Sequence, residues 1–288
     1  MSVHLSALLP VHRGVAPDHL DAALVSLDRQ SVRIDEVVVV EDGPLDPAHE
    51  LVLDRYERSR PAVVRIRMAA NRGAGVANQA GLVAARGTWI VKVDADDLSL
   101  PRRVEAQLVA LRETGADVCG AAMWEFEDHL ATPVRLRSTP LTHDQIARRM
   151  RVNNPINHPT AVYRRELALR VGGYPALRYM QDYDLFARML AGGARMVNLP
   201  EPLVLFRAGS GMIGRRSAPG FWQREVDLQR RLRRYGVVGP SRSACNLVVR
   251  GAFRLLPPHL LSWTYARVLT TPVVAPHPAA SQEGQVRS

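Results

Sequence analysis

The fold is decided by the stretch Trp89-Ile90-Val91-Lys92-Val93-Asp94-Ala95-Asp96-Asp97, a mostly apolar strand that ends directly on three carboxylates. Carboxylates at the end of a buried strand are costly unless a cation lies near them. Alternate residues at a strand end can converge on one ion, so the Asp94-Ala95-Asp96 spacing indicates a divalent metal, Mn²⁺ or Mg²⁺, that bridges a phosphorylated ligand. The alternative is a polar turn in which Asp97 or Ser99 caps the helix that Pro101 begins.

Four short apolar runs, at residues 5–11, 36–40, 63–68 and 88–93, are each followed by a turn and a helical pattern. Helices are predicted at residues 18–30, 76–85 and 102–112, and a further strand at 117–123. This alternation predicts βαβ units, and therefore an α/β fold with a mainly parallel, Rossmann-like sheet.

The alternation of strand and helix patterns ends after about residue 125. A polar, proline-interrupted connection follows and leads to helices predicted at 143–151 and 182–191. We therefore divide the chain into four parts. Residues 1–125 form an α/β half of the nucleotide-binding type, and residues 126–216 form a region of the same domain that closes over it. Residues 217–275 form a basic amphipathic helical tail, and residues 276–288 are predicted to be disordered.

The composition and the apolar segments of the chain indicate its cellular compartment. The two cysteines, Cys119 and Cys245, lie far apart without metal-ligand spacing, which favours a reducing compartment and excludes a structural zinc site. The first eleven residues indicate a strand and not a signal peptide. Prolines and Arg267 interrupt the apolar residues 255–275, so no membrane-spanning segment is predicted. These features predict a cytoplasmic protein.

The formal charge of +10 is carried almost wholly by arginine, because Lys92 is the only lysine. Between Arg207 and Arg254 there are eleven arginines against two acids, Glu225 and Asp227. Such a patch can hold an anionic membrane surface, a polyphosphate or nucleic acid. Nucleic acid is not expected, because no recognition-helix, zinc or aromatic RNA-binding motif accompanies the charge.

The segment 255–269, with its aromatic residues Trp263 and Tyr265, suits a peripheral contact with the inner face of the plasma membrane. The alternative is a solvated basic helix that closes the acceptor side.

Ligands of open α/β sheets collect beyond the carboxyl ends of the strands. Pro10-Val11-His12-Arg13 follows the first predicted strand, and Glu41-Asp42-Gly43-Pro44 follows the second. The Asp42 carboxylate could accept the ring N–H of a pyrimidine, or it could form an Asx-type turn that opens the next helix. After the third strand, the glycines of Asn71-Arg72-Gly73-Ala74-Gly75 would let a phosphate approach a helix N-terminus beside Arg72, although a plain tight turn is the more frequent explanation of such a pattern.

In the second half, the run 153–159, which contains His158, is too polar for an ordinary core element. Further on, Gln181-Asp182 opens an amphipathic helix. Asp182 is either the N-cap of that helix or a general base within reach of a substrate hydroxyl.

With these motifs in order, the chain resembles the family 2 glycosyltransferases, inverting enzymes of the GT-A fold that use nucleotide-diphosphate sugars. Details such as Asn154-Pro155-Ile156-Asn157-His158 are similar to bacterial exopolysaccharide transferases of the amylovoran type. The residues that carry the family resemblance are Leu9-Pro10-Val11, Val39-Val40-Glu41-Asp42-Gly43, Asn71-Arg72-Gly73, Val93-Asp94-Ala95-Asp96-Asp97, Gly172-Gly173-Tyr174 and Gln181-Asp182-Tyr183-Asp184-Leu185.

The resemblance implies a role for each matching residue. Asp42 recognises a uracil-type base with Arg72 close to the nucleotide, Asp94 lies near the ribose or a metal-bound water, and Asp96 holds the Mn²⁺ or Mg²⁺. Asp182 takes the proton from the hydroxyl of a lipid-linked or glycan acceptor. Further donor contacts are expected from Pro10, Val11, Glu41 and Ala95, and donor or acceptor contacts from His158, Gln181 and Arg207.

Three positions depart from the family pattern: Gln181 replaces a common glutamate, Gln79 a common asparagine, and Gly209 a histidine that often follows the arginine matching Arg207. Two other classes compete with the transferase. A sugar-nucleotide pyrophosphorylase would need a glycine-rich phosphate loop after the first strand, where the chain has only His12-Arg13-Gly14. A non-catalytic module that binds nucleotide sugar or an anionic polymer would not need both Asp96 and Asp182.

Overall fold

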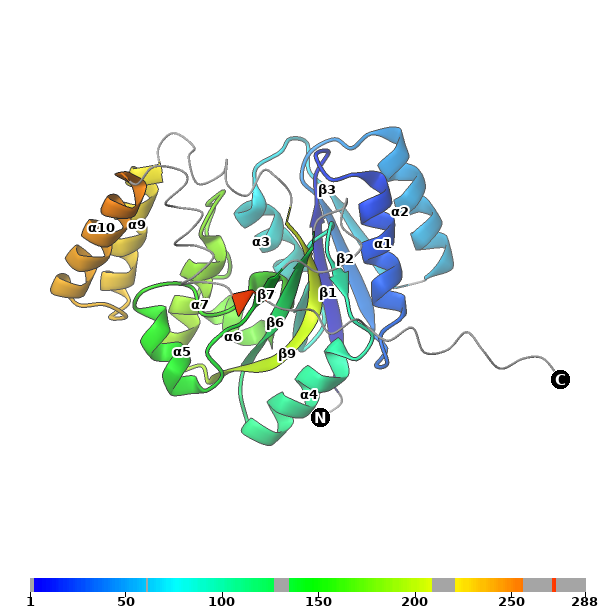
Figure 1. Cartoon of the computed structure of the whole chain (residues 1–288). Coiled ribbons are helices and arrows are strands. Elements are labelled where there is room, and N and C mark those ends of the chain that lie inside the picture. The colour runs from blue at the N-terminus through cyan, green and yellow to red at the C-terminus, as the bar shows by residue number, and fades with distance from the viewer. Residues whose placement is uncertain (1–2, 61, 127–134, 209–220, 256–270, 273–288) are drawn as a thin grey trace.

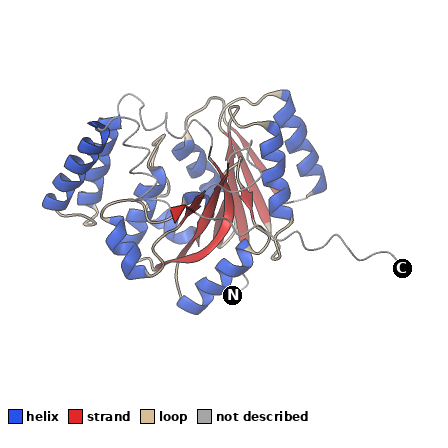
Figure 2. Ribbon diagram, in the orientation of Figure 1, coloured by secondary structure: helices blue, strands red, loops and turns tan. Residues whose placement is uncertain are grey.

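The computed structural model describes residues 3–60, 62–126, 135–208, 221–255 and 271–272. A mixed sheet runs through its centre with helices on both faces (Figures 1 and 2). Its strands are β1 (Leu5–Val11), β2 (Glu36–Glu41), β3 (Val63–Arg67), β4 (Trp89–Lys92), β5 (Leu98–Ser99), β6 (Val118–Phe126), β7 (Arg135–Arg137), β8 (Val162–Arg164), β9 (Met196–Arg207) and β10 (Thr271–Pro272).

The helices follow the predicted alternation in the first half and become frequent in the second. They are α1 (Pro17–Asp28), α2 (Pro47–Ser59), α3 (Ala74–Ala84), α4 (Arg103–Thr114), α5 (His143–Met150), α6 (Arg165–Arg170), α7 (Gln181–Ala191), α9 (Phe221–Arg234) and α10 (Pro240–Leu255), with a 3₁₀ turn at His158–Thr160. The predicted α/β fold is confirmed, and the predicted elements agree with the observed ones within a few residues.

The strand order is β10-β7-β6-β8-β4-β1-β2-β3, with β9 paired to β6 and β5 to β9. Strands β3, β2, β1 and β4 are parallel to one another, whereas β8 runs antiparallel to both β4 and β6. Strands from residues beyond 125 therefore continue the sheet begun by the first half. The division of the chain near residue 125 stays a prediction.

Two hydrophobic clusters lie on the two faces of the sheet. In β1, Leu5, Ala7, Leu9 and Val11 pack toward α1, α2 and α4, while Leu8 packs toward α3 and the helices of the second half. This alternation follows from the two-residue period of a strand. Both faces of β2 are buried, which explains its unbroken run of valines.

Helices α9 and α10 form an antiparallel pair at one side of the molecule (Figure 1). Asp184 of α7 is fully buried, pairs with Arg188, and accepts a hydrogen bond from Tyr235 at 3.0 Å. This contact joins the end of α9 to α7. Several predictions fall outside the described residues: Gly209, the segment 256–269 of the amphipathic stretch, and the disorder of 276–288.

Candidate active site

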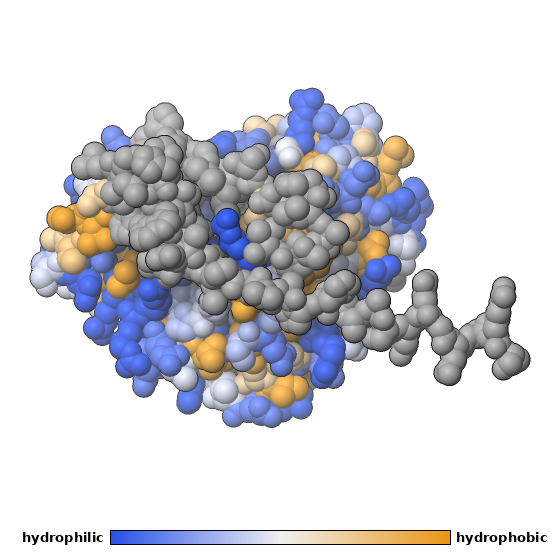
Figure 3. Space-filling model, viewed as in Figure 1, coloured by the Kyte–Doolittle hydropathy of each residue, from blue (hydrophilic) through white to orange (hydrophobic). Residues whose placement is uncertain are grey.

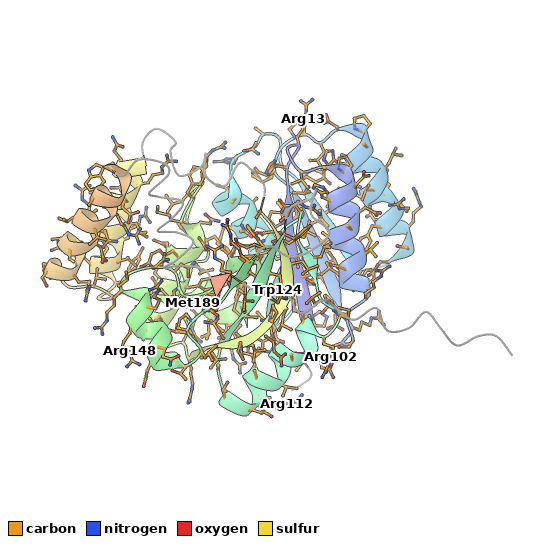
Figure 4. The ribbon with its side chains drawn as sticks, viewed as in Figure 1. Arg13, Arg102, Arg112, Trp124, Arg148 and Met189 are labelled. Carbon is orange, nitrogen blue, oxygen red and sulfur yellow. The ribbon has the colours of Figure 1, made fainter. Side chains whose placement is uncertain are left out.

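The carboxyl ends of β1, β2 and β4 meet at one edge of the sheet, because β1 lies between the other two. Arg13, two residues beyond β1, lies at this edge (Figure 4). The register pairs Pro10 with Val40 and Val11 with Glu41. The predicted donor residues that follow these strands are thus brought together.

Asp42 is buried and is held by the backbone that follows β3. Its Oδ1 accepts the N–H of Arg72 at 2.6 Å, and its Oδ2 accepts the N–H of Gly73 at 2.9 Å. The Asx-turn interpretation is therefore wrong, since the carboxylate contacts a loop about thirty residues further along the chain. A carboxylate has about four acceptor positions, so Asp42 keeps capacity for a further donor. The side chain of Arg72 is exposed at the same place.

Glu41 precedes Asp42 in the sequence, but its side chain forms an ion pair with Arg65 of β3. Its carboxylate accepts a hydrogen bond from Arg65 Nε at 2.8 Å, and both side chains are almost fully buried. Glu41 therefore fastens β2 to β3 beneath the Asp42 loop.

The glycines after β3 accommodate the protein's own chain. A Cβ at Gly75 would meet the carbonyl oxygen of Pro175 at 2.1 Å, and a Cβ at Gly73 would meet the side chain of Arg178 at 2.6 Å. The space beside both glycines is filled by the protein's own chain, and Gly73, at φ 89°, also meets the backbone requirement of the plain-turn interpretation. The two glycines let the segment 175–178, which leads to α7, dock on the N-terminus of α3.

Replacing Gly75 with alanine is expected to destabilise the protein by about 1–3 kcal/mol, because the new methyl group meets backbone that cannot rotate away. Activity should fall further than stability accounts for, since the displaced segment leads to Asp182. Gly239→Ala is the matched control, because a Cβ there meets nothing within 4 Å. Thermal unfolding and initial rates measured on both variants test this. Equal behaviour of the two variants would contradict it.

Asp94 lies over a buried lysine. Lys92 is fully buried, and its Nζ donates to the carboxylate of Asp94 and, at 2.6 Å, to the carbonyl oxygen of Val93. Burial acts to raise the pKa of Asp94, but the charge and hydrogen bond of Lys92, together with the charges of His158 and Arg103, outweigh it and hold that pKa below its usual value. Asp94 is thus kept ionised at the end of β4. The buried Lys92 is a residue that sequence reasoning missed.

The turn after β4 is tied to the end of β9. Asp97 Oδ1 accepts the backbone N–H of Arg207 at 2.9 Å, and Arg207 Nε donates to the carbonyl oxygen of Asp96 at 3.0 Å. The capping interpretation of Asp97 and Ser99 is wrong, because α4 begins at Arg103 without a side-chain cap. The Asp96 carboxylate lies close enough to Arg207 to act on its pKa.

This turn has the chemistry of a divalent-cation site. Burial, with the charges of Asp94 and Asp96, raises the pKa of Asp97 well above its usual value, and its Oδ2 is buried without a hydrogen-bond partner among the described residues. Carboxylate oxygens are the ligands that Mg²⁺ and Mn²⁺ prefer. No group of three His, Cys, Asp or Glu side chains in the described ranges could hold an ion. The residues of this turn alone therefore fit a divalent ion only if other groups complete its coordination.

Asp182 lies in the first turn of α7. The N-cap is Met180, in the left-handed region at φ 62°, so the N-cap interpretation of Asp182 is wrong. Met180 is the one non-glycine residue with positive φ in the part of the chain that the structure describes. Such backbone strain is typical of functional sites. Asn154 Nδ2 donates to Asp182 Oδ2 at 2.7 Å and fixes the orientation of the carboxylate.

His158 connects the two halves of the site. Burial and the charge of Lys92 lower its pKa to about 4, while the charges of Asp182 and Asp94 oppose this shift. The imidazole is therefore neutral, and its pKa responds to both carboxylates, the one at the end of β4 and the one at the start of α7. His158 Nε2 lies 2.9 Å from the hydroxyl of Tyr174, which lies 3.0 Å from that of Tyr163.

Gln79 and Gln181 are the two described departures from the family pattern. Gln79 Oε1 accepts the N–H of Tyr174 at 2.7 Å, so it positions the Gly172-Gly173-Tyr174 turn. Gln181 precedes Asp182 in the first turn of α7 and is partly exposed.

Replacing Asn154 with alanine is expected to lower kcat about 10- to 100-fold with little change in KM for the donor, because Asp182 loses the partner that orients it. Asn153→Ala is the control, since within the described part of the chain the side chain of Asn153 accepts a hydrogen bond only from the neighbouring backbone N–H of Asn154. Steady-state kinetics of the two variants decide the matter, and a loss seen mainly in KM would contradict a positioning role.

The sequence matches the family model "Glycosyl transferase family 2" over residues 6–172, more than half of the chain. The chain belongs to glycosyl transferase family 2. This glycosyltransferase is 32% identical over 264 residues to the amylovoran biosynthesis glycosyltransferase AmsE of Erwinia amylovora, covering 91% of this chain and 98% of AmsE. It is 26% identical to the Escherichia coli UDP-Gal:alpha-D-GlcNAc-diphosphoundecaprenol beta-1,3-galactosyltransferase, over 92% and 96% of the two chains.

Solved structures confirm the GT-A fold of the family 2 glycosyltransferase. Staphylococcus aureus TarS, in complex with UDP-GlcNAc, aligns with a TM-score of 0.62 at 19% identity, covering 79% of this chain and 66% of that one. Against a longer TarS chain, coverage is 39% of that protein. The mannosyltransferase PcManGT of Pyrobaculum calidifontis, in complex with GDP-Man and Mn²⁺, aligns with a TM-score of 0.58 at 16% identity, over 92% and 74% of the two chains.

Proposed function

We propose that this glycosyltransferase is a metal-dependent hexosyltransferase that moves a sugar from a UDP-sugar to a hydroxyl of a lipid-linked or glycan acceptor, with inversion at the anomeric carbon. The observation that carries the proposal is that the segment 154–161 contacts both ends of the site: Asn154 Nδ2 donates to Asp182 Oδ2 at 2.7 Å, and the carbonyl oxygen of Ala161 accepts the N–H of Lys92 at 2.9 Å. This segment brings the strand-end carboxylates and the start of α7 to one place, as a reaction between a donor and an acceptor requires.

The donor occupies the carboxyl ends of β1, β2 and β4. Asp42 accepts the ring N–H of the base, Pro10 and Val11 line the base pocket, and Arg72 lies beside the nucleotide. Asp94, kept ionised by Lys92, accepts from the ribose or an ordered water. Ala95 is small and buried, which brings the backbone close to the ribose. Two relatives named above support UDP as the nucleotide, because one has UDP-Gal in its name and the other binds UDP-GlcNAc.

Asp96 would hold the metal, with Asp97 and Arg207 as its neighbours in the same turn. A divalent ion there would supply Lewis-acid stabilisation of the departing nucleoside diphosphate. The Mn²⁺ in the PcManGT complex supports this assignment. Arg207 is itself well placed to contact the diphosphate, since its Nε already lies against Asp96.

Asp182 acts as the general base. The acceptor hydroxyl gives its proton to the carboxylate while its oxygen attacks the anomeric carbon from the face opposite the leaving diphosphate. One base suffices for this single displacement, which inverts the configuration. Asn154 holds the carboxylate, and the neutral His158 and Gln181 are available to hydrogen-bond the sugar or the acceptor.

We assign the reaction to the cytoplasmic face of the plasma membrane and to the assembly of a polysaccharide. The amylovoran relative and the relative with a diphosphoundecaprenol acceptor in its name support such an acceptor. In the described part of the chain, none of the helices has the length and apolar character needed to span a bilayer.

The proposal is tested with a panel of UDP-, GDP- and dTDP-sugars, with and without Mn²⁺, by thermal shift and donor hydrolysis. We expect UDP-sugars to raise the melting temperature only with metal present, and slow release of UDP. Stabilisation without turnover on any acceptor would favour the non-catalytic binding module, and no response to any donor would overturn the proposal.

A further inference from the structure

Helix α10 has its polar side facing inward. Asn246 is buried and donates to the carbonyl oxygen of Arg151 at 2.8 Å. Arg250 pairs with the buried Glu225 of α9 and donates to the carbonyl oxygen of Val152 at 2.6 Å. Ser243 is buried on the same side. These contacts fix the rotation of the helix about its axis, so its other face has to point outward.

The outward face of α10 is apolar. Its apolar residues are Ala244, Cys245, Val248, Val249 and Ala252, all exposed, with 71% of Val248 and 46% of Val249 accessible; the exposed Ser241 and Arg242 lie at the start of the helix on the same side. Most helices at a protein surface show the opposite arrangement, with the apolar stripe inward. Figure 3 shows apolar residues at the left edge of the view, where α10 lies.

Aromatic and basic residues adjoin this face. Trp222 of α9 is 44% exposed, and its ring lies against α10, 3.5 Å from the Cβ position of Gly251. At the other end of the pair, Arg230, Arg233 and Arg234 line a hollow of about 420 Å³ together with Val238 and Pro240. All three arginines are exposed.

We propose that α9 and α10 form a docking surface for an anionic phospholipid bilayer. The apolar face of α10 and the Trp222 ring enter the interfacial region, and the arginine-lined hollow takes lipid phosphate groups. An exposed apolar face, an interfacial aromatic ring and flanking arginines together are the features of helices that lie in the membrane plane. This inference goes beyond the transfer reaction and does not depend on it.

Charge selects the lipid surface over a second copy of the chain. Two copies joined through this face would bring the same arginines together, and like charges repel. A negatively charged bilayer is complementary to them. A bilayer also removes the apolar face of α10 from water. A soluble anion would bind the arginines but leave that face exposed to water.

The test uses the full chain and co-sedimentation with vesicles of phosphatidylcholine alone or mixed with phosphatidylglycerol. We expect binding to the mixed vesicles only, weakened by added salt. The double variants Arg233→Ala/Arg234→Ala and Val248→Gln/Val249→Gln should each lower the apparent affinity about tenfold or more. All four positions are exposed, so the melting temperature should stay close to that of the wild type.

Two double variants serve as controls. Arg102→Ala/Arg112→Ala removes two exposed arginines, one at the N-cap of α4 and one within that helix, away from α9 and α10 (Figure 4). Leu51→Gln/Val83→Gln removes two exposed apolar side chains from α2 and α3. Both should bind vesicles like the wild type.

Three results would overturn the inference: no binding of the wild type to mixed vesicles, equal losses in test and control variants, or a self-association that the Val248/Val249 variant abolishes while vesicle binding is unchanged. Vesicle binding needs no donor, so its failure is distinguishable from failure of the proposed reaction.

Discussion

Replacing Asp182 with asparagine is expected to reduce kcat by about 10³-fold or more, with KM for the donor nearly unchanged. The amide has the same size as the carboxylate but cannot take the proton of the acceptor hydroxyl, and general base catalysis contributes about 10²- to 10⁴-fold. The donor contacts assigned above involve other residues, so donor binding should persist. Steady-state kinetics and donor thermal shifts measure the two effects separately.

Asp144→Asn is the matched control. Asp144 is the second residue of α5, as Asp182 is of α7, and it is exposed. Both substitutions remove a negative charge from the first turn of a helix, where it interacts favourably with the helix dipole. The control should therefore show the same small loss of stability and full activity. Activity of the Asp182→Asn variant within tenfold of the control would exclude Asp182 as the base.

Replacing Asp96 with alanine is expected to abolish metal-dependent stabilisation by the donor and to lower kcat/KM about 100-fold or more, because a divalent ion contributes several kcal/mol to stabilising charge in the transition state. Folding should be little affected, since the carboxylate lies at a partly exposed turn. Titration of Mn²⁺ in the presence of the donor, followed by thermal shift and by rate, measures both effects.

Glu166→Ala is the control for the change of charge. Glu166 is an exposed acid on α6 whose ion pair among the described residues is with Arg170, four residues on, and its removal should leave the metal titration unchanged. A wild-type metal response in the Asp96→Ala variant would show that the ion, if required, binds elsewhere.

The sequence predicted the sheet well because the decisive signals are local. Each apolar run and the turn after it lie within about ten residues, and strand ends in a parallel sheet necessarily meet at one edge. Asp42, Asp94 and Asp96 are therefore predicted as site residues by their position after a strand. Asp182 was singled out by its place at the start of an amphipathic helix, and the contact with Asn154 adds the group that orients it.

The remaining features depend on partners far apart in the chain. The sequence around Gly75 is typical of a phosphate-binding loop, but in the structure the segment 175–178 fills the space beside this glycine. From the sequence alone, Lys92 is a charged residue that interrupts an apolar strand. Its position two residues before Asp94 is the one local signal for the ion pair between Lys92 and Asp94. The face that α10 turns outward is set by Arg250 and Asn246, whose partners lie on α9 and near Val152. No local pattern contains this information.

The most direct measurement is a crystal structure of the chain with Mn²⁺ and the nucleoside diphosphate selected by the donor panel, using anomalous scattering to locate the metal. The account predicts a metal peak between the Asp96 carboxylate and the diphosphate, with the base against Asp42 and the Asp182 carboxylate on the opposite side of the site. A nucleotide bound away from the ends of β1, β2 and β4, for example in the arginine-lined hollow of α9, would contradict it.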